Sequence, residues 1–382
     1  MTMKKFSYSD AKISTNDIKA VTLATKNGWG KNHNLYVKKF EEKFRKIIGA
    51  KYALAVSSCT GAIHLALSSF NFPKNSEIIL ADSNWIATLS PIIHLGLKPI
   101  LVDVDIKNWC IDPKKIENKI TKKTKCIIVT HLYGNLCDMK SINKIAKKYN
   151  LKVIEDCAES LGSKINDINT GNFSDIACFS FHGSKIITTG EGGMLITKHK
   201  KYFDRAEILN NHGRTNKNYY GFLANEIGYK FKMTNMQAAI GLSQLNRLKE
   251  KVLNKRVMFK NYKKFLSDLE LNFNPENSGE YNSYWMTNIV FDKKYKINIK
   301  KLMNYLKKRN IQTRYFFPPL SKMKLLKAKK NNKNAMFLYK NSINLPSSLT
   351  LRQNDIFYVC NEIKKYLKRS KKNKITDQMI KT

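Results

Sequence analysis

Short runs of apolar residues alternate along the chain with longer segments in which apolar residues recur at helical spacing. The runs, each bounded by polar or glycine residues, cover 53–56, 77–80, 99–105, 126–130, 151–154, 176–181 and 194–197. Such runs predict buried strands. Between them lie segments such as 35–48, where Val37, Phe40 and Phe44 fall on one face of a predicted amphipathic helix.

The regular alternation of strands and helices from residue 53 to residue 197 indicates an α/β fold. Its central sheet is expected to be mostly parallel, with helices on both faces. Outside this stretch the pattern predicts helices over 17–25 (capped by Thr15 or Asn16), 236–253, 299–308 and from Gln353, and a strand over 285–290. We therefore expect a large domain over 1–250 with an N-terminal arm, a small α/β domain over 251–370, and a basic, disordered tail over 371–382.

Several chemically capable residues come directly after predicted strands. They are Thr60, Trp85, Asp156, Ser180 and Lys185. In a parallel α/β sheet, ligands bind at the carboxyl ends of the strands. We therefore expect these five side chains to converge on one site.

Lys185 and Asp156 suit the chemistry of pyridoxal phosphate. A lysine that forms a Schiff base must be neutral to attack a carbonyl, and partial burial lowers its pKa. A carboxylate opposite the pyridine nitrogen keeps the cofactor ring protonated, so that the ring accepts electrons. Taken alone, however, the pair could also be a surface lysine and a helix-capping aspartate.

The turn Ser57-Ser58-Cys59-Thr60-Gly61 joins a predicted strand to a predicted helix. A strand-to-helix turn of small residues offers backbone N–H groups and the positive end of a helix to a phosphate. Thr60 is the main candidate for this contact. Cys59 can contribute through its backbone, provided that the turn needs no positive φ at this position.

Several long motifs in order resemble those of the sugar aminotransferases of the DegT/DnrJ/EryC1/StrS family. They are Ile154-Glu155-Asp156-Cys157-Ala158-Glu159, Phe179-Ser180-Phe181-His182-Gly183-Ser184-Lys185 and Thr188-Thr189-Gly190-Glu191-Gly192-Gly193-Met194. The resemblance runs from about Ser7 to about Lys364. It implies a pyridoxal phosphate enzyme of aminotransferase fold type I, with Lys185 as the residue that bonds the cofactor.

The same resemblance assigns roles to further residues. It implies cofactor contacts from Cys59, Thr60, Trp85, Asp156, Glu159, Ser180, Lys185 and Lys232. In the family, an aromatic side chain at the position of Trp85 stacks on the pyridine ring. The phosphate turn departs from the usual Ser-Gly-Thr-Ala, because Cys59 stands where glycine is common and Gly61 where alanine is common.

Other residues are implied on the substrate side or in a partner subunit. Trp29, in a glycine-flanked loop, could stack on a sugar or base, or could anchor its own loop. Lys232 is a candidate to reach the cofactor phosphate of a neighbouring subunit in a homodimer with shared active sites, or it could be a solvated lysine. His182, Arg314 and Phe317 are candidates for the substrate mouth, and His131 is expected to be structural.

Glu159 stands where many relatives have glutamine. A glutamate at this position resembles the branch of the family that makes perosamine. Residues 135–139 and 186–189 resemble that branch too. A GDP-4-keto-6-deoxymannose-like substrate, with glutamate as amino donor, is therefore expected. The alternatives are another UDP- or dTDP-linked keto-sugar, or a regulatory relative without catalysis. Lys185 argues against the sugar dehydratases of this fold, which have histidine in its place.

Composition adds three expectations. The net charge of +40 could suit nucleic acid, but the lysines are spread along the chain and we expect no nucleic-acid partner. No apolar run approaches the length of a membrane span, and the start lacks the apolar segment of a signal peptide. The seven cysteines show no metal-type spacing, so we expect no metal site and a cytoplasmic location.

The assignment of Lys185 predicts a coloured protein. Purified enzyme should be yellow, and Lys185→Ala should lose the absorbance band of the lysine-bound cofactor, because the change removes the amine that forms the bond. An absorbance spectrum of each protein is the measurement. A spectrum of the variant like that of the wild type would disprove the assignment.

Overall fold

The computed structural model describes residues 4–215, 223–326 and 332–379, with the backbone alone for 370–379. A seven-stranded sheet forms its centre, in the order β1-β9-β8-β5-β4-β2-β3. The strands are β1 (Tyr52–Val56), β2 (Glu77–Ala81), β3 (Lys98–Val102), β4 (Thr124–Thr130), β5 (Lys152–Asp156), β8 (Ile176–Ser180) and β9 (Gly193–Thr197). Only β9 among them runs antiparallel to its two neighbours, so the predicted mostly parallel sheet is confirmed.

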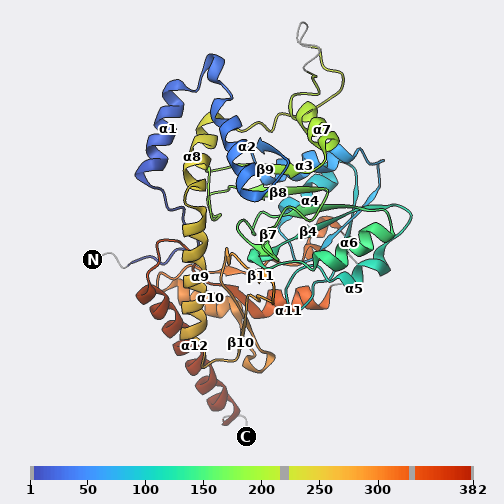
Figure 1. Cartoon of the computed structure of the whole chain (residues 1–382). Helices are drawn as coiled ribbons and strands as arrows, with labels where there is room; N and C mark the ends of the chain where they lie inside the picture. The colour runs from blue at the N-terminus through green and yellow to red at the C-terminus, as the bar shows by residue number, and fades with distance from the viewer. Residues whose placement is uncertain (1–3, 216–222, 327–331, 380–382) are drawn as a thin grey trace.

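Both faces of this sheet are covered because successive residues of each strand point to opposite sides. Ile78 and Leu80 of β2 pack in one apolar cluster with helices α3 (Cys59–Phe70), α4 (Ile86–His94) and α7 (Lys200–Asn210). Ile79 and Ala81 pack in the other cluster, with α2 (Leu35–Ile48) and α6 (Met139–Lys148). The short helix α5 (Pro113–Ile116) adds Ile116 to this second cluster. Figure 1 shows the helices around the sheet.

A second, antiparallel sheet is formed later in the chain, in the order β10-β12-β14-β13. Its strands are β10 (Leu271–Phe273), β12 (Asn288–Phe291), β14 (Ser342–Asn344) and β13 (Arg314–Tyr315). It shares an apolar cluster with α10 (Ile299–Lys307), α12 (Gln353–Met379) and the last turns of α9 (Leu248–Phe265). A separate core of this kind supports our proposal of a small domain that begins near residue 251.

The remaining elements join the two parts. Helices α1 (Thr15–Asn27) and α8 (Asn235–Leu245) lie side by side, and α8 continues into α9 as a column along one side of the molecule (Figure 1). Helix α11 (Lys333–Asn341) leads into β14. A small sheet pairs β6 (Lys164–Ile165) with β7 (Ile168–Asn169) and with β11 (Glu280–Tyr281). Within the described ranges, no helix is long and apolar enough to cross a membrane.

Several element boundaries differ from the sequence prediction. The cap of α1 is Ser14, whose hydroxyl accepts from Asp17 N while the Asp17 carboxylate accepts from Ser14 N. Helix α3 begins at Cys59 rather than at residue 62, because Ser58 caps it.

The predicted helix over 236–253 is two helices. Arg247 leaves helical geometry (φ −112°, ψ 14°) where its side chain pairs with Asp17 at 2.6 Å. The predicted strand over 285–290 starts later, at Asn288, after Tyr284 adopts a φ of 48°. The backbone of α12 is helical through Met379, across most of the stretch that we expected to be disordered.

Lys255 of α9 is buried, and its ammonium group donates to the backbone oxygens of Trp285 (2.9 Å) and Ser347. Burial, with a smaller contribution from Lys251, lowers the pKa of Lys255 to about 7. The unfolded chain, where lysine titrates near its ordinary pKa of about 10.4, therefore binds more protons than the folded chain between pH 7 and pH 10. The free energy of unfolding contributed by this group rises with pH across that window.

We predict that Lys255→Met removes this pH dependence. The stability difference between wild type and variant should change by roughly 2 kcal/mol from pH 7 to pH 9, in favour of the wild type at the higher pH. Urea unfolding at the two pH values measures it. The matched control is Lys260→Met, at an exposed position of the same helix. A difference independent of pH would contradict the prediction.

Candidate active site

A cavity of about 750 Å³ opens at the carboxyl ends of the parallel strands. Ten of the twelve residues singled out from the sequence line it: Cys59, Thr60, Trp85, Asp156, Glu159, Ser180, His182, Lys185, Arg314 and Phe317. The five residues expected to converge from strand ends do so. Tyr8 and Ser9 of the N-terminal arm and residues 314–318 from the second sheet close the cavity.

The turn at the start of α3 has the geometry of an anion site. The first N–H groups of a helix have no acceptor inside the helix. The Ser58 hydroxyl accepts a hydrogen bond from the N–H of Gly61 at 3.0 Å. Cys59 and Thr60, the next two residues after this cap, line the cavity. Cys59 has no positive φ, so the departure from glycine costs no strain.

Strand β9 supports this turn from behind. A Cβ atom added at Gly193 would lie 2.6 Å from Ser58 O and Cys59 N. Only a residue without a side chain lets the strand approach so closely. The Cys59 thiol itself lies 4.0 Å from Asp156, and burial raises its pKa well above the usual value, so it stays protonated.

Asp156, the last residue of β5, is a buried carboxylate with three neutral donors. Thr88 Oγ1 donates to it at 2.6 Å, Ala158 N at 3.1 Å and the Cys59 thiol at 4.0 Å. Burial raises the pKa of Asp156 despite these hydrogen bonds. A protonated pyridine nitrogen would offset the cost of the buried charge, so this carboxylate fits the ring nitrogen of pyridoxal phosphate.

Lys185 is held between an acid and an aromatic face. Its Nζ lies 3.2 Å from Glu159 Oε1 and 3.7 Å from the ring centroid of Trp285. Glu159 also accepts from Tyr133 N at 2.8 Å, and burial raises its pKa while the charge of Lys185 opposes that rise. Tyr133 adopts a φ of 58°, an unfavourable conformation that aims its N–H at Glu159.

The cavity wall carries aromatic side chains. Trp85 caps α4 and is 55% exposed, so its ring is available to stack on a flat ligand. Its ring centroid lies 5.6 Å from that of Phe317, whose N–H donates to the Tyr133 hydroxyl at 3.0 Å. Asn84 Oδ1 accepts from Trp85 N at 2.8 Å and fixes the backbone at this point.

Polar groups surround the mouth. The guanidinium of Arg314 lies 5.1 Å from the ring centroid of Tyr8. His182 Nδ1 lies 2.9 Å from the Ser184 hydroxyl, and its Nε2 lies 3.7 Å from Glu191. Ser180 is buried beneath them and accepts from His182 N at 3.3 Å.

Two predicted site residues do not line the cavity of their own chain. Trp29 donates from Nε1 to Thr25 O at 2.6 Å, so it anchors its own loop, with 59% of its surface exposed. Lys232 donates to Asn211 Oδ1 at 2.7 Å. Both lie on the surface of the single chain. The contact of Lys232 with a neighbouring subunit stays a prediction, and so does the stacking of Trp29 on a sugar or base.

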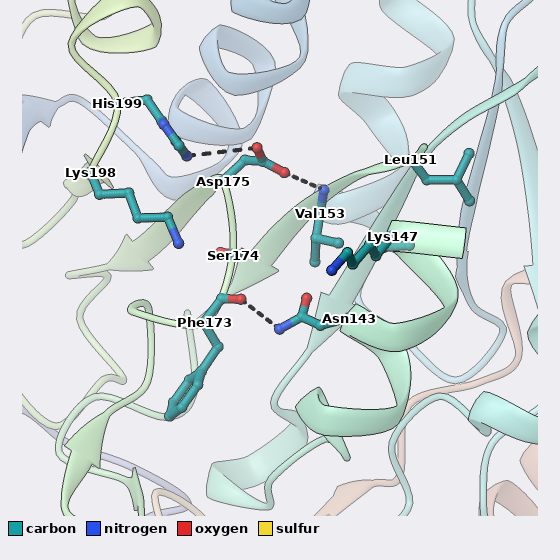
Figure 2. A pocket seen from close by; sticks show the side chains of 10 residues that line it. Asn143, Lys147, Leu151, Val153, Phe173, Ser174, Asp175, Lys198 and His199 are labelled. Atoms are coloured by element: carbon teal, nitrogen blue, oxygen red, sulfur yellow. Dashed lines mark hydrogen bonds and ion pairs between the residues drawn. The ribbon is translucent and has the colours of Figure 1, made fainter. Parts of the chain in front are cut away.

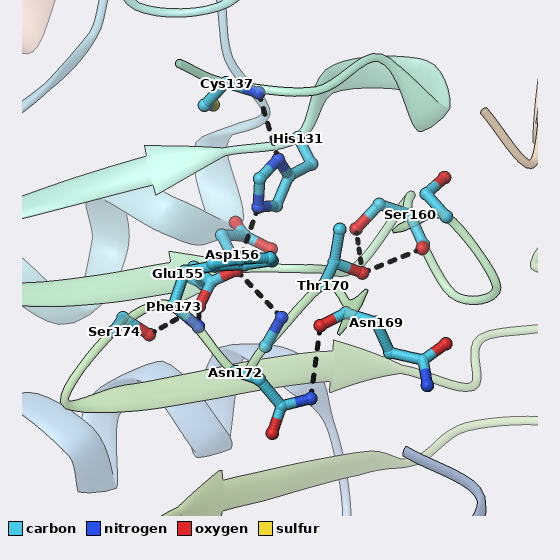
Figure 3. A network of polar contacts seen from close by, with 12 residues as sticks. His131, Cys137, Glu155, Asp156, Ser160, Asn169, Thr170, Asn172, Phe173 and Ser174 are labelled. Atoms are coloured by element: carbon cyan, nitrogen blue, oxygen red, sulfur yellow. Dashed lines mark hydrogen bonds and ion pairs between the residues drawn. The ribbon is translucent and has the colours of Figure 1, made fainter. Parts of the chain in front are cut away.

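The residues next to Asp156 form a saturated polar network, which Figure 3 shows. His131 lies 3.1 Å from Glu155 through Nε2 and accepts from Cys137 N at 3.2 Å through Nδ1. Glu155 also accepts from Gly171 N, Phe173 N and Ser174 Oγ.

His131, Glu155 and Cys157 lie close enough together to hold a metal ion. The hydrogen bonds already occupy the oxygens of Glu155, and they lower its pKa despite its burial. We therefore regard His131 as structural, as expected, and assign no metal to this cluster.

The sequence did not indicate four residues that the structure brings to the site. Thr88 could have been found, because it lies one helical turn after Trp85 and faces the same side. Tyr8, Tyr133 and Trp285 come from distant parts of the chain and line or flank the cavity only through the tertiary fold. No local pattern marks them.

A second hollow, of about 300 Å³, lies near the amino ends of β5 and β8 (Figure 2). Its one carboxylate, Asp175, accepts from Val153 N at 3.0 Å and lies 3.8 Å from His199. Phe173 O accepts from Asn143 at 2.8 Å. These groups satisfy one another, and none of the twelve residues singled out from the sequence lines this hollow.

A parallel α/β sheet with a buried lysine, a buried acid and an anion-binding helix start defines a pyridoxal phosphate-dependent aminotransferase of fold type I. The model of the DegT/DnrJ/EryC1/StrS aminotransferase family matches residues 11–364, and the chain belongs to this family. It is a sugar aminotransferase that uses pyridoxal phosphate. The family resemblance, fold class, cofactor and activity expected from the motifs are confirmed.

Named relatives cover nearly the whole chain. GDP-perosamine synthase of Escherichia coli O157:H7 is 38% identical over 339 residues, 88% of this chain and 92% of that protein. GDP-perosamine synthase of Vibrio cholerae is 32% identical over 358 residues, 93% and 97% of the two chains. The solved structure of Helicobacter pylori PseC, an aminotransferase involved in the biosynthesis of pseudoaminic acid, superposes with a TM-score of 0.90 at 25% identity. The match covers 96% of this chain and 100% of that one.

The contact of Thr88 with Asp156 generates a prediction. Thr88→Val keeps the shape of the side chain but removes a donor from a buried carboxylate. Pyridoxal phosphate affinity should fall roughly tenfold, the weight of about 1.4 kcal/mol expected for such a bond. An absorbance titration of cofactor-free protein measures it. Thr88→Ser, which keeps the hydroxyl, should recover most of the affinity, and equal affinities for the valine variant and wild type would refute the role.

Proposed function

We propose that this enzyme transfers an amino group from glutamate to the keto carbon of GDP-4-keto-6-deoxymannose and forms GDP-perosamine for surface polysaccharide. The observation that carries the proposal is the pairing of Lys185 with Glu159 at 3.2 Å in the base of the cavity. The glutamate at position 159 resembles the perosamine branch of the family, and the two relatives of 38% and 32% identity bear that activity in their names.

The residues around the cavity suit pyridoxal phosphate. The start of α3 would hold the phosphate, Asp156 the ring nitrogen, and Trp85 one face of the ring. When bound, the cofactor supplies an electron-accepting ring next to the reacting carbon. Thr88 keeps the Asp156 carboxylate oriented through its 2.6 Å hydrogen bond.

Lys185 is then the group that moves protons. Its Nζ takes a proton from the α-carbon of the amino donor and holds it as an ammonium beside Glu159. The Glu159 carboxylate attracts the positive charge that Nζ carries while it holds this proton. The side chain of Lys185 is only 13% exposed, which limits exchange of this proton with water.

The mouth of the cavity suits an anionic, sugar-bearing substrate. Arg314 and His182 supply donors there, and Phe317 with Trp85 supplies flat apolar faces. A cavity of 750 Å³ lies within the usual range for small-molecule sites. We propose that Arg314 faces the phosphates of the nucleotide and His182 the sugar.

We further propose a homodimer with shared sites. Ile18 and Leu23 of α1 are more than half exposed, as are Trp29 and Ile227. Exposed apolar residues of this size favour burial against a partner. Such a dimer would bring Trp29 and Lys232 to the neighbouring cavity. All seven cysteines are free thiols, which supports a cytoplasmic location.

Another UDP- or dTDP-linked keto-sugar is the alternative substrate. The similarity to PseC, an aminotransferase involved in the biosynthesis of pseudoaminic acid, and to a dTDP-3-amino-3,6-dideoxy-alpha-D-galactopyranose transaminase supports keeping it.

The test is to incubate the enzyme with glutamate and a panel of GDP-, UDP- and dTDP-linked keto-sugars, and to follow amination by mass spectrometry. We expect a mass gain from keto to amino sugar with GDP-4-keto-6-deoxymannose at a rate at least tenfold above the others, since discrimination by buried polar contacts is strong. Faster amination of a UDP- or dTDP-sugar would replace the proposal by its alternative.

A further inference from the structure

The indole of Trp285 touches the catalytic lysine, although it comes from the chain segment that leads into the second sheet. Its ring centroid lies 3.7 Å from Lys185 Nζ. On another side of the same amine lies the Glu159 carboxylate at 3.2 Å. An ammonium on an aromatic face and beside a carboxylate is attracted to both. Trp285 is 3% exposed, so little water competes with its ring for the charge.

Trp285 makes a second contact with the same part of the chain. Its Nε1 donates to Ser184 O at 2.7 Å. The hydroxyl of Ser9, from the N-terminal arm, donates to the same oxygen at 2.7 Å. Ser184 O belongs to the peptide bond that precedes Lys185. The two donors therefore fix the backbone from which the lysine side chain extends.

Trp285 is itself held in place. Buried Lys255 donates to Trp285 O at 2.9 Å. The indole stacks on Tyr133, with 6.1 Å between ring centroids and 17° between planes. Tyr133 N in turn donates to Glu159. The contacts thus close a ring from Trp285 through Tyr133 and Glu159 to Lys185.

We propose that Trp285 is a positioning residue for the reaction, which holds the Lys185 amine against Glu159 whenever the amine is free of the cofactor. The indole ring limits the directions in which the released Lys185 side chain can move. The hydrogen bond from Trp285 Nε1 to Ser184 O holds the backbone next to Lys185 in place. The inference rests on the proposed role of Lys185. It does not depend on which nucleotide-sugar is the substrate.

A core role alone would make different predictions. Trp109 is the matched control, because it is also a buried tryptophan but packs on Phe316 rather than on the lysine. Trp109→Phe should disturb folding stability without a specific effect on Lys185. Trp285→Leu removes both the ring and the donor. Trp285→Phe keeps a smaller ring and removes the donor.

The test measures how fast acetic anhydride acetylates Lys185 in full-length, cofactor-free enzyme. Peptide mass spectrometry follows the reaction, with exposed Lys260 as internal reference. We expect roughly a tenfold faster reaction in Trp285→Leu, corresponding to a cation–π contact in a desolvated site. Trp285→Phe should lie between that variant and wild type, and Trp109→Phe should match wild type.

Loaded enzyme supplies the second readout. In Trp285→Leu, kcat should fall roughly tenfold while KM for glutamate stays within about twofold, because the contact acts on the released amine rather than on binding of the donor. Should Trp285→Leu not fold, the same comparison is made with Trp285→Phe. Unchanged acetylation of Lys185 in the soluble Trp285 variants, or an equal increase in Trp109→Phe, would overturn the proposal. A failure of Lys185→Ala to lose the cofactor band would instead disprove the lysine assignment.

Discussion

The site depends on keeping a carboxylate buried at the end of β5. Asp156 is 4% exposed, and its donors are a hydroxyl, a backbone N–H and a thiol, none of which is charged. The pKa of Asp156 is raised because burial makes the charged form of this carboxylate unfavourable. A cationic ring nitrogen relieves that cost, so the arrangement favours the protonated form of the cofactor. Much of the surrounding structure serves to keep this carboxylate in place.

The scaffold behind Asp156 is polar rather than apolar. Glu155 points to the other side of β5 and ties the loop 170–174 to the strand through three donors, while His131 joins it from β4. A fully satisfied buried network fixes geometry well, because any shift leaves a group without a partner. The strand end that carries Asp156 is therefore fixed in register with its neighbours on both sides.

The sequence predicted what is encoded locally. All seven central strands appeared as apolar runs, and the polar residues that follow them converge, as the topology of a parallel sheet requires. Ser14 was missed as a cap, because Thr15 and Asn16 are equally good caps by type. The break between α8 and α9 depends on the pairing of Arg247 with Asp17, 230 residues away.

The substrate side was harder to predict because it, too, depends on contacts between residues that are distant in the sequence. Tyr8, Tyr133 and Trp285 come to the site only after the N-terminal arm and the second sheet have packed, and a single chain does not contain the neighbour that Lys232 was expected to meet. The close approach of Gly193 to the Ser58–Cys59 peptide has a consequence for reading natural variation. A side chain at this position would push the phosphate turn outward and weaken the binding of the cofactor. Such a substitution, although it lies in a strand, should therefore behave as a vitamin-responsive defect that a higher cofactor concentration compensates.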